Sequence, residues 1–168
     1  MFKKEYLASY IKWGVLSALV FCIPMLIFLY KGDFVSTWYL FLGDGLVMVV
    51  IGAYMLAWNK SKGENASTQT MVAAGHIATV IAIIISCIVA FIALPMFVPG
   101  AFGEGKADEV LVGAPSQTGT GKTNGLVFIL FMCATVGIFC FGSFASFLLP
   151  YTARKDQTKD RKSEVLNN

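Results

Sequence analysis

Four long apolar stretches, each with at most one Lys, Arg, Asp or Glu residue, constrain this chain more than any other feature. They cover about residues 10–30, 36–58, 71–98 and 124–149. A bilayer core about 30 Å thick is crossed by roughly 20 apolar residues of helix. The stretches are continuously apolar, whereas the strands of a membrane barrel alternate. The sequence therefore predicts an all-α membrane protein, a bundle of four transmembrane helices.

The spans leave little chain for a separate domain. We expect one transmembrane domain over residues 1–150 and a polar cytoplasmic tail over residues 151–168. Lys3 and Lys4 precede a long apolar run that has no small-residue cleavage site after it. This pattern is typical of a retained signal anchor rather than of a cleaved signal peptide.

The basic residues predict the orientation of the chain. Of the 13 Lys and Arg residues, ten lie on one side of the predicted membrane and three on the other. The positive-inside rule places the side with ten in the cytoplasm, so both termini are predicted to be cytoplasmic. The net charge of +3 reflects this orientation, and we expect no nucleic-acid partner. The ten are Lys3, Lys4, Lys12, Lys60, Lys62, Arg154, Lys155, Lys159, Arg161 and Lys162, and the three are Lys31, Lys106 and Lys122.

The third span carries a small residue at every fourth position. Small side chains let helix backbones approach closely, and such packing drives helix association in lipid. We therefore expect a packing ridge on this helix, which we interpret as the central one of the bundle. The ridge consists of Ala74, Ala78, Ala82, Ser86 and Ala90.

Asp44 is the one acidic residue inside a predicted span, where it lies between two glycines. Insertion scales assign a central Asp a cost of roughly 2.5–3.5 kcal/mol, so such residues usually turn inward and are paired. No Lys or Arg lies at its depth, so Asp44 must be protonated, hydrated, hydrogen-bonded or paired with another subunit. Centring each span in the bilayer places Ser86 and Thr135 near the same level. We therefore predict an intramembrane polar layer of Asp44, Ser86 and Thr135.

Three roles for this layer are open from the sequence. It can hold the helices together, it can respond to protons or ions in a transport path, or Asp44 can meet a partner protein. A single acid in one small bundle does not by itself define a pump.

The sequence offers no cluster of residues for a cofactor or a metal. His76 is the only histidine, which is too few for the two axial ligands of a b-type haem bundle or for most metal sites. The four cysteines lie within spans and form no C-x-x-C pair, and buried thiols behave as small hydrophobes. We expect no catalytic residues, no metal and no cofactor, and we interpret the chain as not an enzyme. The cysteines are Cys22, Cys87, Cys133 and Cys140.

Length and layout together resemble an uncharacterised family of small four-helix inner-membrane proteins from bacteria of the Bacteroidota type. The shared features are a short first outer loop, the Asn59-Lys60 turn before a third helix rich in small residues, a long second outer loop and a charged tail. The resemblance covers the whole chain and implies a multi-pass protein of the bacterial cytoplasmic membrane. It implies no particular activity.

These observations predict a non-catalytic accessory or scaffold subunit of a larger inner-membrane complex. The partners would be the lipid bilayer and other integral membrane subunits, or further copies of the chain. The alternative is a small oligomeric transporter or channel that uses Asp44. Four helices enclose a path only narrowly, so a transport function would need an oligomer.

Overall fold

The structure is a computed structural model, and it describes residues 4–62, 68–98 and 125–166. The described residues form helices, four of which are long and apolar enough to cross a membrane. This confirms the predicted all-α class and the number of helices that could cross a membrane, and each boundary lies within about four residues of the predicted one. The predicted long outer loop lies outside the described residues. The spans are Tyr6–Lys31, Phe34–Ser61, Thr68–Phe97 and Gly125–Thr152.

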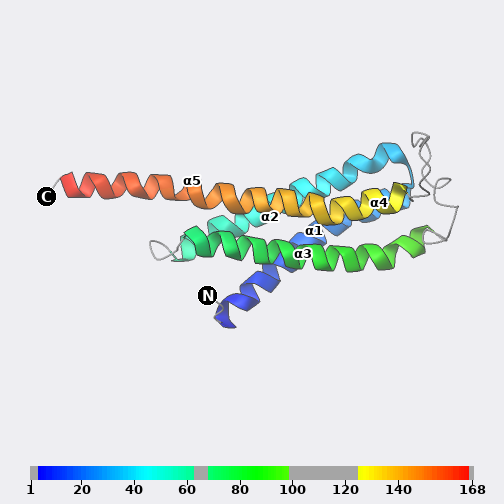
Figure 1. The fold of residues 1–168 in the computed structure, drawn as a ribbon, viewed down its shortest axis with the longest axis horizontal. Helices are drawn as coiled ribbons and strands as arrows, with labels where there is room; N and C mark the ends of the chain where they lie inside the picture. Colours follow the sequence, from blue (N-terminus) through cyan, green and yellow to red (C-terminus); the bar gives the residue numbers. More distant parts are fainter. Residues whose placement is uncertain (1–3, 63–67, 99–124, 167–168) are drawn as a thin grey trace.

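The chain runs back and forth through the bundle, and its two described ends lie toward the same end of the molecule (Figure 1). A 3-10 turn leads into the second span, and a π-helix interrupts the fourth span. The fourth span is therefore made of three consecutive helical segments. In chain order the elements are α1 (Lys4–Lys31), η1 (Phe34–Thr37), α2 (Trp38–Lys62), α3 (Thr68–Phe97), α4 (Gly125–Met132), the π-helix η4 (Cys133–Gly137) and α5 (Ile138–Leu166).

The helices are arranged around a four-cornered bundle. Helix α1 packs beside α2 and α3, and α5 also packs beside α2 and α3, so α1 and α5 lie across a diagonal. Helix α3 thus has the same two principal neighbours as α2, and the prediction that it is central is wrong. The reason is that close approach along one ridge buries only one side of a helix. Ile84 and Ile88, on the other side of α3, are each 54% exposed.

The ridge of α3 faces the interior, where all five of its small residues are fully buried. Glycines lie at the closest contacts between α3 and its neighbouring helices. A Cβ atom added to Gly14 of α1 would lie 2.7 Å from the Cβ of Ile81, and one added to Gly75 of α3 would lie 2.8 Å from the Cβ of Ser146. The backbones can approach this closely only because those side chains are absent.

A compact turn connects α1 to α2. Gly32 has a φ of +62°, the left-handed conformation that glycine adopts without strain, and its N–H donates to the carbonyl of Phe28 at 3.0 Å. The carboxylate of Asp33 then accepts hydrogen bonds from the backbone N–H groups of Val35 and Ser36 and so caps η1. The turn therefore satisfies the Phe28 carbonyl at the end of α1 and two N–H groups at the start of η1.

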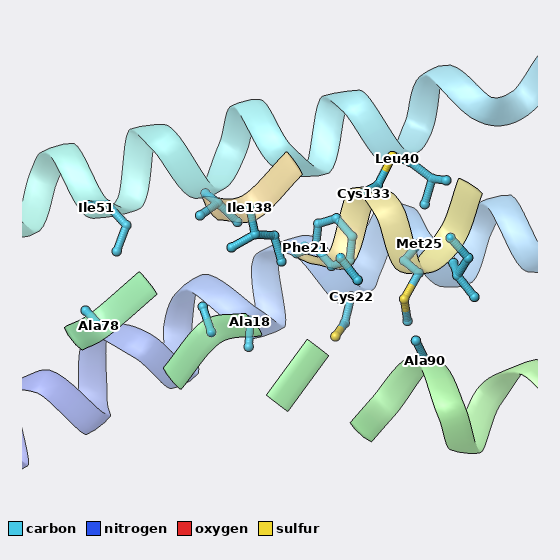
Figure 2. Close-up of a cluster of buried hydrophobic side chains, with 14 of the residues drawn as sticks. Ala18, Phe21, Cys22, Met25, Leu40, Ile51, Ala78, Ala90, Cys133 and Ile138 are labelled. Carbon is cyan, nitrogen blue, oxygen red and sulfur yellow. The ribbon is translucent and has the colours of Figure 1, made fainter. Parts of the chain in front are cut away.

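The core is formed by apolar side chains from all four spans. Figure 2 shows Phe21 and Met25 of α1, Leu40 of α2 and Cys133 of η4 clustered in the interior. Each of the first three has an exposed fraction of 0%.

An aromatic cluster joins the start of α1 to the end of α2. The ring of Trp58 lies 5.2 Å from that of Tyr6, 5.8 Å from that of Tyr10 and 5.8 Å from that of Tyr54. Such pairs contribute roughly 0.5–1.5 kcal/mol beyond the burial of their surface. Trp58 itself is only 6% exposed. The cluster thus fixes the α1–α2 pair at the end of the bundle where the chain begins.

Candidate functional site

Asp44 lies on α2 and points into the bundle, where it is only 1% exposed. Neither carboxyl oxygen has a hydrogen-bond partner among the described residues. The sequence predicted that this residue turns inward, and its burial agrees with that expectation. The cation that usually accompanies such a residue is not found in the part of the chain that the structure describes.

The carboxyl group of Asp44 is packed directly against Gly137, the last residue of the π-helix η4. A Cβ atom added to Gly137 would lie 2.7 Å from the Cγ of Asp44 and 2.8 Å from its Oδ1. The carboxyl group therefore occupies the space that a side chain at position 137 would fill. The π-helix is rare in proteins and is found mostly as a single turn inside an α-helix, frequently at functional sites.

Two further contacts enclose Asp44. Cys133, at the other end of η4, is buried and lies close enough to Asp44 for the two groups to interact electrostatically. On α1, Phe21 packs on Gly43, where an added Cβ would lie 3.0 Å from the Phe21 ring. An aromatic ring next to Gly43 and a buried thiol are thus the neighbours found near Asp44, and no ion pair to Asp44 is present among the described side chains.

The other two residues of the predicted polar layer are also placed by the structure. Ser86 on α3 is fully buried. Its hydroxyl lies beside the thiol of Cys22 but has no hydrogen-bond partner among the described residues. Thr135 is half-buried in η4, and its hydroxyl donates to the carbonyl of Phe131 at 2.6 Å. The three side chains are therefore not hydrogen-bonded to one another.

Contacts between α3 and the fourth span indicate the relative level of these residues. A Cβ added to Gly142 would lie 2.6 Å from the Cγ2 of Thr79, so these two residues are directly opposed. The two helices run antiparallel. Seven residues onward from Thr79 is Ser86, and seven residues back from Gly142 is Thr135. The register therefore places Ser86 and Thr135 at a similar height, and Thr135 is two residues from the glycine that touches Asp44.

This arrangement limits the chemistry available to Asp44. A buried charged group without a partner is far more costly than a buried neutral group. An apolar ring and a thiol do not supply the strong donors that stabilise a carboxylate, such as backbone N–H groups or a guanidinium. Asp44 is therefore suited to packing as a neutral acid or to receiving a proton or a small cation.

The remaining candidates lie apart from Asp44. The Nδ1–H of His76 donates to the carbonyl of Val72 at 2.9 Å, and the imidazole ring lies 5.0 Å from the ring of Phe147. His76 thus belongs to the α3–α5 contact near the start of α3. Among the described residues, no group of three or more His, Cys, Asp or Glu side chains is arranged to hold a metal ion.

Sequence reasoning did not identify Gly137 or the π-helix. The signal available was a glycine in the fourth span near the predicted level of Asp44, but many glycines in spans have no such contact. Gly45, adjacent to Asp44, shows the difference, because nothing lies within 4 Å of a Cβ added there. Only the three-dimensional contact distinguishes the two glycines.

Comparison with known proteins adds no relative. No protein-family model, no curated protein and no solved structure matches the chain. The resemblance to the Bacteroidota family therefore stays a prediction, and the function has to be argued from the structure itself.

Proposed function

We propose that this protein is a non-catalytic accessory or scaffold subunit of a larger complex in the bacterial inner membrane. The observation that carries the proposal is the length of α5. This helix continues to Leu166, whereas the apolar span ends at Thr152. Figure 1 shows the last part of α5 standing out from the bundle without a neighbouring helix.

The projecting part of α5, residues 153–166, corresponds to roughly 20 Å of helix at about 1.5 Å per residue. Isolated helices of this length are marginally stable in water. In the sequence, acids recur every four residues at Asp156, Asp160 and Glu164. Like charges at this spacing destabilise a helix by roughly 0.2–0.5 kcal/mol per pair. A partner surface that packs on this segment would stabilise it, which is the role expected of a docking element.

The interior of the bundle supports the same proposal. Asp44 contacts Gly137 of the same chain, and the α3 ridge is closed against its neighbours. The groups that are free to meet another protein within the membrane are therefore the exposed apolar side chains. Helix α3 presents a row of them, Val80, Ile84 and Ile88, which suits lipid or the apolar face of another subunit.

The orientation is part of the proposal. Ten of the 13 basic residues lie at the end that holds both termini, and the positive-inside rule assigns that end to the cytoplasm. Fusing green fluorescent protein or alkaline phosphatase to the C-terminus tests this assignment in cells. We expect a fluorescent protein fusion that is bright and a phosphatase fusion that is inactive. The reverse pattern would overturn the orientation.

The test of the scaffold proposal is gentle extraction of the tagged full chain followed by mass spectrometry. We expect a constant set of other membrane subunits in stoichiometric amount. A variant that ends after Thr152 should lose these partners, and a matched variant that ends after Leu166 should keep them. Recovery of only an isolated monomer from the full chain would contradict the proposal.

A second candidate is a small transporter or channel, which the two unpartnered oxygens of Asp44 favour. It predicts that Asp44→Asn abolishes a pH-dependent flux in proteoliposomes and leaves the assembly intact. An unchanged flux in that variant would exclude Asp44 as the carrier. We prefer the scaffold because Asp44 is enclosed within one chain, whereas an oligomeric path would have to expose it.

A further inference from the structure

A cleft opens between α3 and α5 at the end of the bundle where α3 begins. The two helices touch closely at Gly75 and Ser146, and the cleft lies on the side of this contact toward the start of α3. Its volume is about 800 Å³, within the range of roughly 300–1,000 Å³ that is typical of small-molecule sites. Its lining residues are Thr68, Gln69, Val72, Ala73, His76, Phe147 and Tyr151.

The lining divides into polar and apolar parts. Thr68 and Gln69 lie in the first turn of α3 and Tyr151 near the end of the apolar span on α5, so the polar groups lie where the spans meet water. Phe147 and Tyr151 also line a second, apolar groove that continues along α5 over Phe144 and Leu148. The combined site is therefore polar at the membrane boundary and apolar toward the membrane interior.

His76 provides a polar group between these two parts. Because a carbonyl oxygen only accepts, the bond to Val72 places a hydrogen on Nδ1. The other ring nitrogen, Nε2, takes no part in that bond. The ring is held edge-on between Phe147 and Phe139, at centroid distances of 5.0 and 6.4 Å. A protonated His76 thus presents an Nε2–H donor from a fixed position.

The described lining of the cleft contains no Asp or Glu that would repel an anionic ligand. The hydroxyl and amide groups of the cleft can donate to phosphate oxygens, and the imidazole can do so through Nε2 in its protonated form.

We propose that this cleft binds a glycerophospholipid, with its phosphate held by His76, Gln69 and Tyr151 and an acyl chain lying in the groove along α5. The apolar groove is the reason to choose a lipid rather than a free phosphate ion. The site is separate from Asp44 and does not depend on the scaffold function, since it requires only the α3–α5 pair.

Native mass spectrometry of the purified full chain tests this proposal with three probes. Dioleoyl phosphatidylglycerol carries both features, dioleoylglycerol has the same chains without phosphate, and inorganic phosphate has no chains. We expect one retained phosphatidylglycerol, little dioleoylglycerol, and no displacement of the lipid by millimolar phosphate. Equal retention of the two lipids would show that the chains alone bind, and displacement by inorganic phosphate would show a free-anion site. Either result would overturn the proposal.

Two variants locate the site. His76→Phe keeps an aromatic ring beside Phe147 and removes both ring nitrogens, and Tyr151→Phe removes one hydroxyl. Each should weaken phosphatidylglycerol retention about tenfold, the loss expected for one hydrogen bond to a charged group. Tyr30→Phe is the matched control, because Tyr30 is 80% exposed in the last turn of α1, at the end of the bundle away from the cleft. Unchanged retention in both cleft variants, with circular dichroism showing a folded bundle, would place the lipid elsewhere and refute the proposal.

Discussion

The contact between Asp44 and Gly137 makes a quantitative prediction about a pair of residues far apart in sequence. A methyl group at position 137 would lie 2.7 Å from the Cγ of Asp44, about 1 Å inside ordinary van der Waals contact. Asp44 is only 1% exposed, so its carboxyl group cannot move out into solvent to make room. Overpacking of this kind costs about 1–3 kcal/mol, so Gly137→Ala should destabilise the bundle by that amount.

Removing the carboxyl group should relieve the clash. Asp44→Ala eliminates an unpartnered buried polar group, which itself costs about 1–3 kcal/mol, and leaves a small cavity, so its net effect should be small. In this background the methyl group of Gly137→Ala enters the vacated space. We expect its cost to fall below about 0.5 kcal/mol, which gives a coupling free energy of at least about 0.5 kcal/mol in the double-mutant cycle.

The assay is reversible unfolding in mixed micelles, with the folded fraction followed by tryptophan fluorescence as the denaturing detergent increases. Gly45→Ala is the matched control, because it changes a glycine on the same helix as Asp44, at a position where nothing lies within 4 Å of the added Cβ. It should not destabilise the protein, since Ala is favoured over Gly in a helix. If Gly137→Ala costs the same free energy with and without the Asp44 carboxyl group, the two residues do not share this space and the reasoning is refuted.

Three other predictions follow from the turn, the aromatic cluster and the cysteines. Asp33→Ala should lower the free energy of unfolding by about 1 kcal/mol because η1 loses its cap, and Asp33→Ser should retain most of that stability. Equal losses in the two variants would contradict a capping role. Trp58→Ala should destabilise the bundle by about 3–5 kcal/mol, measured by the same detergent titration, and a loss below about 1 kcal/mol would show that the α1–α2 contact does not depend on this ring. In the native protein a membrane-permeant maleimide should label the exposed Cys140 before the buried Cys22 and Cys133, as intact mass would show; early labelling of the buried pair would contradict the packing.

The sequence predicted the spans well because their apolar length has one main physical cause, the thickness of the bilayer core. Their ends were less accurate. Helix α5 continues to Leu166, where hydropathy ends the span at Leu149, because backbone hydrogen bonds continue in polar sequence where water is available. Hydropathy expresses whether a segment prefers lipid or water, and it does not indicate the residue at which the helix ends.

The candidate site was predicted only in part. Asp44 is conspicuous because a lone acid in an apolar stretch is costly. That cost can be recognised without knowing which residues pack around Asp44. Its contact with Gly137 joins the second and fourth spans through a π-helix, and nothing local in Cys133–Gly137 specifies that geometry. The cleft beside His76 was also missed, since Phe147 and Tyr151 come to it from another helix. Side-chain packing decides which distant segments pair. The periodicity of residues along one helix carries no information about that pairing.

The diagonal placement of α1 and α5 has a consequence for biogenesis. Spans enter the membrane in the order of their synthesis, so α1, α2 and α3 arrive before the segment that carries Gly137. Until then the corner of the bundle next to α2 and α3 stays empty, and Asp44 borders lipid or the insertion machinery. Arrival of the fourth span completes its burial. A chain that lacks the fourth span therefore leaves uncovered an acid that the complete bundle buries.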